Sequence, residues 1–253
     1  MNRLIATLAL LGIFLPTLAS ADDGKWQYAL SPYLWFAGLK GDIATTPPFP
    51  PVSVDIPPSD AIEDTEVGLM LGFDMSKGKH GLVADLVYTD VQSDIELIPE
   101  PISLTMKSTS ETTMFSLGYQ YVMYHEGAAR VSVLAGGRYW QLDSRLEFGL
   151  GGTALSGLTV EHDESWVDPL IGVKGSSPFS VGSKFYIQGS AIIGGFGVGA
   201  DFLYDLSVAV GYQFNKAIGA GVGYRLYDVD YQKDDFLYDV TQQGWLIGLT
   251  WAF

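Results

Sequence analysis

The last ten residues, Gly244-Trp-Leu-Ile-Gly-Leu-Thr-Trp-Ala-Phe253, form the most informative stretch of the sequence. Large apolar residues occupy every second position, and the positions between them are mostly small or polar. Successive side chains of an extended strand point to opposite faces, so this alternation predicts a strand with one strongly apolar face. The apolar residues are Trp245, Ile247, Leu249, Trp251 and Phe253.

An exposed aromatic stripe of this kind promotes aggregation in water, whereas lipid is a suitable solvent for it. The stretch ends on the aromatic Phe253, and it resembles the signal that the barrel-assembly machinery reads in Gram-negative outer-membrane proteins. We therefore predict that it is the last strand of a membrane barrel and that the assembly machinery is a partner.

Similar alternation recurs upstream and is typical of outer-membrane barrels. The apolar faces of a soluble β-sandwich alternate in the same way, so the terminal strand and the N-terminus decide between the two folds. We predict an all-β, antiparallel transmembrane β-barrel of about ten strands, with eight or twelve as alternatives. The expected strands are 26–39, 62–75, 80–95, 104–123, 129–148, 158–175, 184–197, 201–214, 217–231 and 236–253.

The N-terminus has the features of a secretory signal peptide. Arg3 precedes an apolar run from Leu4 to Leu15, and Ala19-Ser20-Ala21 is a small-residue cleavage site. A spanning helix needs about 20 apolar residues, and this run is shorter. We expect cleavage before Asp22, so that residues 1–21 are the signal peptide and residues 22–253 form one barrel domain in the outer membrane of a Gram-negative bacterium.

Composition agrees with an exported β-protein. The chain has 30 glycines and no cysteine, which excludes disulfides and thiol chemistry. The net charge is −15, and loss of Arg3 with the signal peptide leaves 13 basic against 29 acidic residues, a net charge of −16. This balance argues against nucleic acid as a partner. Outer-membrane lipid and lipopolysaccharide are the expected surroundings, with the carboxylates in loops and lumen.

Connections of two lengths join the predicted strands. The links 76–79, 125–128, 176–183 and 215–216 are mostly tight and are expected at the periplasmic end, whereas the long links 42–61 and 149–157 are expected outside the cell. Short links near Gly199 and Lys233 are also expected outside, so the length rule is obeyed only loosely. Half of the 12 prolines lie between Thr46 and Pro58. Because proline cannot donate to a ladder, we predict an extended outer loop there and not a strand.

Charged residues recur on the strand faces opposite to the apolar ones, and these faces should line the lumen. A barrel of about ten strands has little free space inside. An unpaired ion in that interior costs several kcal/mol, so we expect a bonded network that plugs the lumen, with a charge-lined pore as the alternative. The expected members are Glu66, Asp74, Asp85, Arg138, Asp168, Lys174 and Arg225, with Asp168 and Arg225 as partners.

Catalytic signals are weak. His162 lies in Glu161-His-Asp-Glu-Ser165 near the expected outer rim, where barrel proteases and lipid A-modifying enzymes have their sites. The sequence shows no His-x-Ser pair like that of lipid A deacylases and no convincing Asp-Asp and Asp-His pairs like those of omptins. Acidic clusters near 161–164, 228–230 and 234–239 offer oxygen ligands without EF-hand spacing. We expect a hydrated acidic rim, no enzyme activity, no cofactor and no metal.

Several short motifs carry a family resemblance. They are Trp166-Val-Asp-Pro-Leu-Ile-Gly172, Gly194-Gly-Phe-Gly-Val-Gly-Ala-Asp201, Gly223-Tyr-Arg225 with Asp230-Tyr231, Phe236-Leu-Tyr-Asp239, Ser31-Pro-Tyr-Leu-Trp35 and Gly137-Arg-Tyr-Trp140. On these motifs the chain resembles a family of small, largely uncharacterised proteobacterial outer-membrane β-barrel proteins. The resemblance covers most of the chain after the signal peptide and implies a single barrel without assigning an activity.

Together these patterns predict an outer-membrane β-barrel with a structural or surface-interaction role and a polar, largely plugged lumen. A narrow channel for small solutes is the first alternative, and a rim-located hydrolase is the second. The patterns make no prediction of a ligand or an oligomeric state.

Overall fold

The computed structural model describes residues 24–45, 50–98, 104–150 and 158–253, and the predicted signal peptide lies outside the described residues. The elements are β1 (Gln27–Ala44), β2 (Val52–Ile56), α1 (Pro58–Glu63), β3 (Thr65–Lys77), β4 (His80–Ile98), β5 (Leu104–Glu126), β6 (Ala129–Leu150), β7 (Leu158–Pro178), β8 (Phe185–Gly195), β9 (Phe202–Gln213), β10 (Ile218–Lys233) and β11 (Phe236–Ala252). Within these residues no helix is long and apolar enough to cross a membrane.

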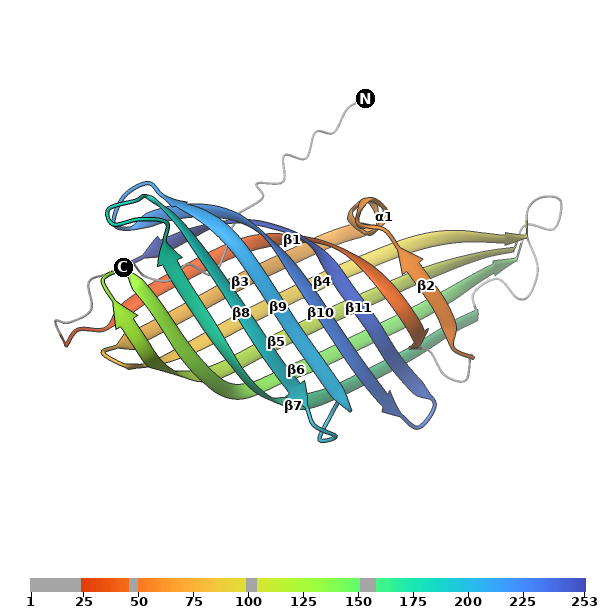
Figure 1. Cartoon of the computed structure of the whole chain (residues 1–253). Helices are drawn as coiled ribbons and strands as arrows, with labels where there is room; N and C mark the ends of the chain where they lie inside the picture. The colour runs from red at the N-terminus through yellow and green to blue at the C-terminus, as the bar shows by residue number, and fades with distance from the viewer. Residues whose placement is uncertain (1–23, 46–49, 99–103, 151–157) are drawn as a thin grey trace, which may run out of the picture.

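Ten of the strands form a closed antiparallel barrel. Each strand pairs with its neighbour in the chain from β3 to β11, β1 pairs with β3, and β11 returns to pair with β1 (Figure 1). The predicted fold and the count of ten strands are confirmed. Most predicted strand boundaries are close to those observed, and the largest difference is in β1, which ends at Ala44 and not at residue 39.

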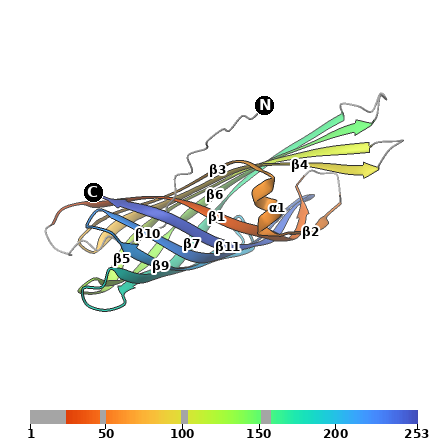
Figure 2. The same cartoon turned by 90° about the horizontal axis from the view of Figure 1, so that it is seen from above.

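The two ends of the barrel differ. Tight turns join β3 to β4, β5 to β6, β7 to β8 and β9 to β10 at the end where the C-terminus lies, and we name this the short-turn end. The strands β4 to β7 contain 19, 23, 22 and 21 residues, whereas β8 and β9 contain 11 and 12. As a result, β4 to β7 continue as an open sheet at the opposite end, which we name the far end (Figure 2).

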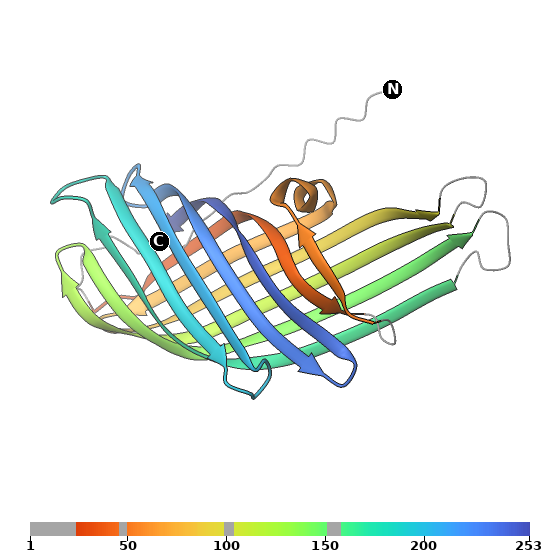
Figure 3. The same ribbon diagram turned by 45° about the vertical axis from the view of Figure 1, so that its right-hand side comes forward.

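The segment predicted as an extended loop contains two elements, so that part of the prediction was wrong. β2 pairs with β1 from Leu39↔Ile56 to Ile43↔Val52, and α1 follows it directly (Figure 3). The pairing of β1 with β3 covers only Gln27 to Pro32, so the far part of β1 has a free edge for β2. Val52, Val54 and Ile56 favour a strand, and the prolines lie on both sides of it.

The outer face of the barrel carries an apolar band with aromatic borders. Near the short-turn end, the rings of Tyr28 and Phe253 stack at 5.6 Å and those of Phe185 and Tyr212 meet edge to face at 4.8 Å. At the other border, Tyr224 and Trp245 form a T-shaped pair at 5.6 Å. Aromatic girdles on both sides of an apolar band are typical of barrels that span a membrane. Between them lie exposed residues such as Leu69, Leu117, Ile171, Val208, Val222 and Leu249.

The predicted terminal strand has the expected geometry. Trp245, Leu249, Trp251 and Phe253 are 40–62% exposed and lie on the outer face of β11, which also carries Ile247. The alternate residues face inward: Leu246 is 6% exposed and Thr250 is bonded to Ser31 across the β11–β1 pair. The role of the five apolar residues as an assembly signal stays a prediction.

Candidate functional site in the lumen

Four charged side chains from four strands meet in the middle of the lumen. Arg225 on β10 holds Asp205 on β9 with two parallel hydrogen bonds, Nε to Oδ1 at 2.9 Å and Nη2 to Oδ2 at 2.6 Å. Arg138 on β6 donates to the same Asp205 Oδ2 at 2.6 Å. Arg225 Nη2 also reaches Asp85 Oδ2 on β4 at 3.4 Å. We name these four residues the arginine–aspartate quartet.

Neutral side chains add hydrogen bonds to the quartet, although the buried Nη1 of Arg138 has no hydrogen-bond partner among the described residues. Tyr33 on β1 donates to Asp85 Oδ1 at 2.8 Å and accepts from Arg225 Nη1 at 3.0 Å. Arg138 Nε donates to Ser116 at 2.8 Å. All four charged residues are at most 8% exposed. The quartet has no net charge, and its bidentate, charge-assisted bonds offset part of the cost of removing four ions from water.

A second polar bridge spans the lumen nearer the short-turn end. Lys174 on β7 is bonded to Asp74 on β3, and Gln120 on β5 donates to both Asp74 oxygens at 3.0 Å. β3 and β7 stand on different sides of the barrel, separated by three strands in the sheet order. The bridge therefore connects walls that share no backbone hydrogen bonds.

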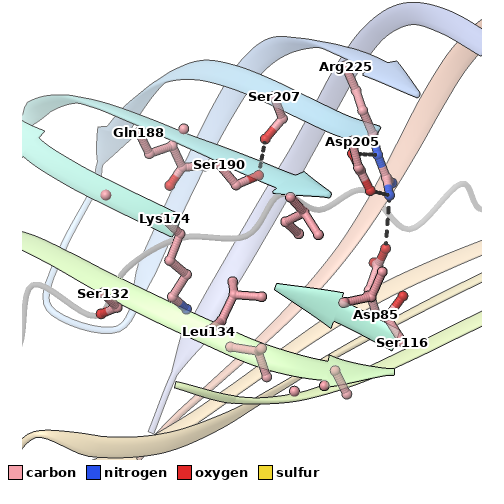
Figure 4. Close-up of a pocket in the computed structure, with 18 of the residues that line it drawn as sticks. Asp85, Ser116, Ser132, Leu134, Lys174, Gln188, Ser190, Asp205, Ser207 and Arg225 are labelled. Carbon is pink, nitrogen blue, oxygen red and sulfur yellow. Dashed lines mark hydrogen bonds and ion pairs between the residues drawn. The ribbon is translucent and has the colours of Figure 1, made fainter. Parts of the chain in front are cut away.

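A cavity of about 160 Å³ lies between the two networks. Its lining includes Lys174 from the bridge and all four residues of the quartet. Figure 4 shows Ser132, Lys174, Ser190 and Ser207 following one another along the wall toward Arg225. In the strand register these residues are consecutive cross-strand partners, so one continuous row of polar side chains lines the cavity.

On the far side of the quartet, aromatic rings fill the lumen. Trp166 stacks on Trp140 at 5.4 Å and on Tyr231 at 3.9 Å, with interplanar angles of 6° and 8°. Arg138 lies over the ring of Tyr227 at 5.1 Å, which joins the quartet to these rings. We name the following group the aromatic layer, whose members are all at most 7% exposed: Trp35, Trp140, Trp166, Tyr227, Tyr231, Phe236 and Tyr238.

The structure places six of the seven expected network residues inside the barrel. Asp74, Asp85, Arg138, Asp168 and Arg225 are buried, and Lys174 is bonded to Asp74. Glu66 is exposed at an irregularity in the β3–β4 register between Thr65 and Val67, so its assignment to the buried network is corrected. The extra residue at that point disturbs the alternation on which the assignment depended.

The expected pairing of Asp168 with Arg225 is also wrong. Asp168 accepts from Trp166 Nε1 at 2.9 Å and from the backbone amide of Ala200 at 2.7 Å. Its carboxylate therefore fixes the β8–β9 turn against β7. Arg225 has Asp205 as its main partner, a residue that the sequence interpretation did not single out. Asp205 alternates with the apolar residues of its strand, on the same face as Ser207 and Ala209, and this alternation could have identified it as a lumen residue.

The far rim holds a smaller cluster around Glu164. Glu164 accepts from Tyr231 at 2.9 Å and from Lys233 at 3.0 Å, and its carboxylate raises the pKa of Lys233 through that hydrogen bond. His162 stacks on Phe236 at 5.5 Å, with its Nε2 4.0 Å from Glu164 Oε2. In the described part of the chain, no group of three or more His, Asp or Glu side chains is arranged to hold a metal ion.

Among the solved structures that resemble this chain, one has a TM-score above 0.5 and shows the same fold. The Escherichia coli outer membrane protease OmpT is 10% identical, with a TM-score of 0.55, and the match covers 93% of this chain and 100% of OmpT. The translocator domain of the autotransporter NalP from Neisseria meningitidis is 12% identical with a TM-score of 0.39, covering 92% of this chain and 90% of that domain. Ail of Yersinia pestis is 8% identical with a TM-score of 0.32, covering 92% and 100%. No family model and no curated protein matches, so the family resemblance stays a prediction.

Proposed function

We propose that this chain is a non-conducting barrel of the Gram-negative outer membrane that acts at its far end, on the cell surface. The shared fold with an outer membrane protein and the apolar band with its two aromatic borders support the location. All connections at the end with the C-terminus are short, whereas the far end also carries the long connection from β1 to β3, and this difference favours the periplasmic side for the C-terminal end. The far end then faces the outside.

The aromatic layer is the observation that carries this proposal. Its rings come from β1, β6, β7, β10 and β11 and pack against one another across the lumen. Buried hydrophobic residues such as Leu203, Val229 and Val240 pack in the same cluster. A solute crossing the barrel would have to displace these rings and then the quartet below them. A close-packed interior resists such displacement, because it has few alternative arrangements.

The protruding sheet supports a role at the surface. A spanning strand needs about 9–11 residues, and β4 to β7 contain about twice that number. At about 3.3 Å per residue, the excess carries these strands roughly 30 Å further along their own direction. β8 and β9 have no such excess, so the protrusion is one-sided and presents two faces and two free edges, one along β4 and one along β7.

Current recording in planar bilayers tests the proposal. The protein is folded in detergent, its insertion is verified by protection of the apolar band from protease, and current is measured over a range of salt concentrations. We expect no steady conductance. A steady conductance that rises with salt would overturn the non-conducting barrel and favour the narrow channel.

A rim-located hydrolase is a second candidate, favoured by one arrangement. Ser144 on β6 lies directly opposite His162 on β7, and Ser144 is 7% exposed. His162 Nε2 is buried without a hydrogen-bond partner in the described chain and lies 4.0 Å from Glu164. Nucleophilic hydrolysis uses a histidine with a serine at one ring nitrogen and a carboxylate at the other. Since Nε2 is the nitrogen nearer Glu164, Nδ1 is the one left for Ser144.

The test of this candidate is cleavage of lipid A or of peptides by the folded barrel. Loss of that cleavage in both Ser144→Ala and His162→Ala, with Ser165→Ala unaffected, would support it. Ser165 is a suitable control because it is exposed and is the last residue of the same Glu161–Ser165 stretch. Absence of cleavage by the unaltered protein would end the hydrolase hypothesis.

A further inference from the structure

The cavity between the two polar networks is lined by two chemically different surfaces. One consists of apolar side chains that come from six strands: Val83, Leu134, Leu170, Ile192, Ala209 and Leu246. The other is the row of serines, the glutamine and the cations on β6 to β10. A water molecule occupies about 30 Å³ in the liquid, so a cavity of about 160 Å³ has room for a molecule of several heavy atoms.

Charge is unevenly distributed around this cavity. The lining contains four cationic residues and two carboxylates, and Asp74 adds a third carboxylate through its bond to Lys174. The quartet is internally neutral, and so is the Lys174–Asp74 pair. Arg130 on β6 is the cation that remains. Asp168 does not offset it, because Asp168 lies outside the lining and is bonded to Trp166 and Ala200.

Arg130 is positioned with unused hydrogen-bonding capacity. Its Nη2 donates to the Gly78 carbonyl in the β3–β4 turn at 3.2 Å, which fixes the side chain at the short-turn end. Its Nε is buried and has no hydrogen-bond partner among the described residues. The guanidinium therefore lines the cavity as a charged donor that shares the charge of Asp74 with Lys174, to which Asp74 is bonded, and has no carboxylate of its own.

Two buried hydroxyls beside Arg130 are also without partners. Ser132 is 1% exposed, Ser176 is 9% exposed, and neither Oγ has a hydrogen-bond partner in the described parts of the chain. Ser176 is the direct cross-strand partner of Arg130, and Ser132 is two residues from it on the same face of β6. Unpaired buried hydroxyls each cost free energy, so a group of them favours a bound molecule with acceptor atoms.

We propose that this cavity binds a small organic anion, a carboxylate with a short apolar body, that enters from the short-turn end. The carboxylate accepts hydrogen bonds from Arg130, Ser132 and Ser176, and the apolar body lies against the leucine, isoleucine and valine side chains. A metal cation is disfavoured by the positive excess, and a multiply charged inorganic anion would leave the apolar surface unused. This site is additional to the surface role proposed above and does not depend on it.

Calorimetric titration of the full-length barrel, folded in detergent, tests the site. Sodium butyrate is the probe, 1-butanol has the same apolar body without the charge, and inorganic phosphate has charge without the body. We expect saturable binding of butyrate, at least about tenfold tighter than either of the others, because a hydrogen-bonded charge contributes about this factor. A titration with sodium chloride at matched ionic strength corrects for general salt effects.

Variants separate this site from adventitious binding. Arg130→Gln should weaken butyrate binding about tenfold or more, and Ser132→Ala with Ser176→Ala should weaken it several-fold. Arg145→Gln is the matched control, because Arg145 is exposed at the far rim and paired with Glu161. No saturable heat with butyrate, equal binding of butanol or phosphate, or unchanged binding in Arg130→Gln would each overturn the proposal. The three wild-type titrations decide it even where a variant fails to fold.

Discussion

The two halves of the lumen are built differently by the same strands. β10 shows the change within one element: its inward residues are Gly219, Gly221 and Gly223 near the short-turn end, and then Arg225, Tyr227, Val229 and Tyr231 toward the far end. The first half is hollow and crossed by ionic bridges, and the second is filled by stacked rings. A closed barrel can therefore contain two kinds of interior. We expect the stability of the first half to depend on charged partners and that of the second half to depend on side-chain volume.

The largest expected effect is in the half held by ions. Arg225→Ala removes the main partner of Asp205 and a partner of Asp85, and both carboxylates stay buried. Breaking a buried pair from one side typically costs about 3–5 kcal/mol, and we expect a loss near the lower end of that range because Asp205 keeps Arg138 and Asp85 keeps Tyr33. Urea unfolding of the detergent-folded barrel, followed by circular dichroism, measures it. Arg145→Ala at the exposed far rim is the control and should change stability by less than about 0.5 kcal/mol.

A double variant sharpens this result. Arg225→Ala combined with Asp205→Ala removes both partners of the bidentate pair, so the combined loss should be smaller than the sum of the single losses. Strict additivity would contradict the account in which the incompletely paired carboxylate of Asp205 is the source of the cost.

The half filled by rings should respond to a change of volume. Trp166→Ala removes the ring between Trp140 and Tyr231 and leaves a void, for which we expect a loss of about 3 kcal/mol. Val83→Ala removes a smaller side chain, and it does so at the wall of the existing cavity, where packing is already incomplete. We expect this variant to lose about 1 kcal/mol of stability. Equal losses in the two variants would remove the distinction between the halves.

Much of this arrangement is predictable from period-2 alternation. The alternation gave the ten barrel strands and the outward face of β11, because lipid on one side and a narrow lumen on the other impose opposite polarities on neighbouring residues. It also assigned the inward positions of Asp74, Asp85, Arg138, Asp168 and Arg225. It failed at Glu66, where a one-residue irregularity changes the phase of the pattern.

The partners inside the lumen were not predictable in the same way. Asp205 and Arg138 are 67 positions apart, and their contact depends on strand tilt and on the short β8–β9 hairpin, which the alternation does not describe. The pairing of β2 was not predictable either, because it depends on the residue of β1 at which the pairing with β3 ends. Local pattern fixes the face on which a side chain lies, and the three-dimensional register decides which side chain it meets.

The next effect in size concerns the closing seam, where β11 meets β1. Gly244 is paired with Ala37, and a Cβ at Gly244 would collide with the backbone carbonyl of Phe36. Gly244→Ala should therefore push the two strands apart and cost about 1–3 kcal/mol. Gly118→Ala is the matched control in the hollow half, where the nearest atom is 3.4 Å away. Thermal unfolding measures both, and a Gly244→Ala barrel as stable as the Gly118→Ala barrel would contradict this reading of the seam.

The smallest expected effect lies at the far rim, outside the apolar band, where Lys233 is bonded to Glu164. That hydrogen bond, with the charge of Glu164, raises the pKa of Lys233 above its ordinary value of 10.5. A raised pKa in the folded state means that the contribution to stability is fully present below the ordinary value and is lost as the pH rises through the folded value. The unfolding midpoint of the wild type should exceed that of Lys233→Met by a small, constant amount up to about pH 10, and the difference should shrink above it. Lys40→Met controls for loss of an exposed, paired lysine at the same end. A difference that persists unchanged in strong alkali would show that packing of the lysine stem, and not its charge, stabilises the rim.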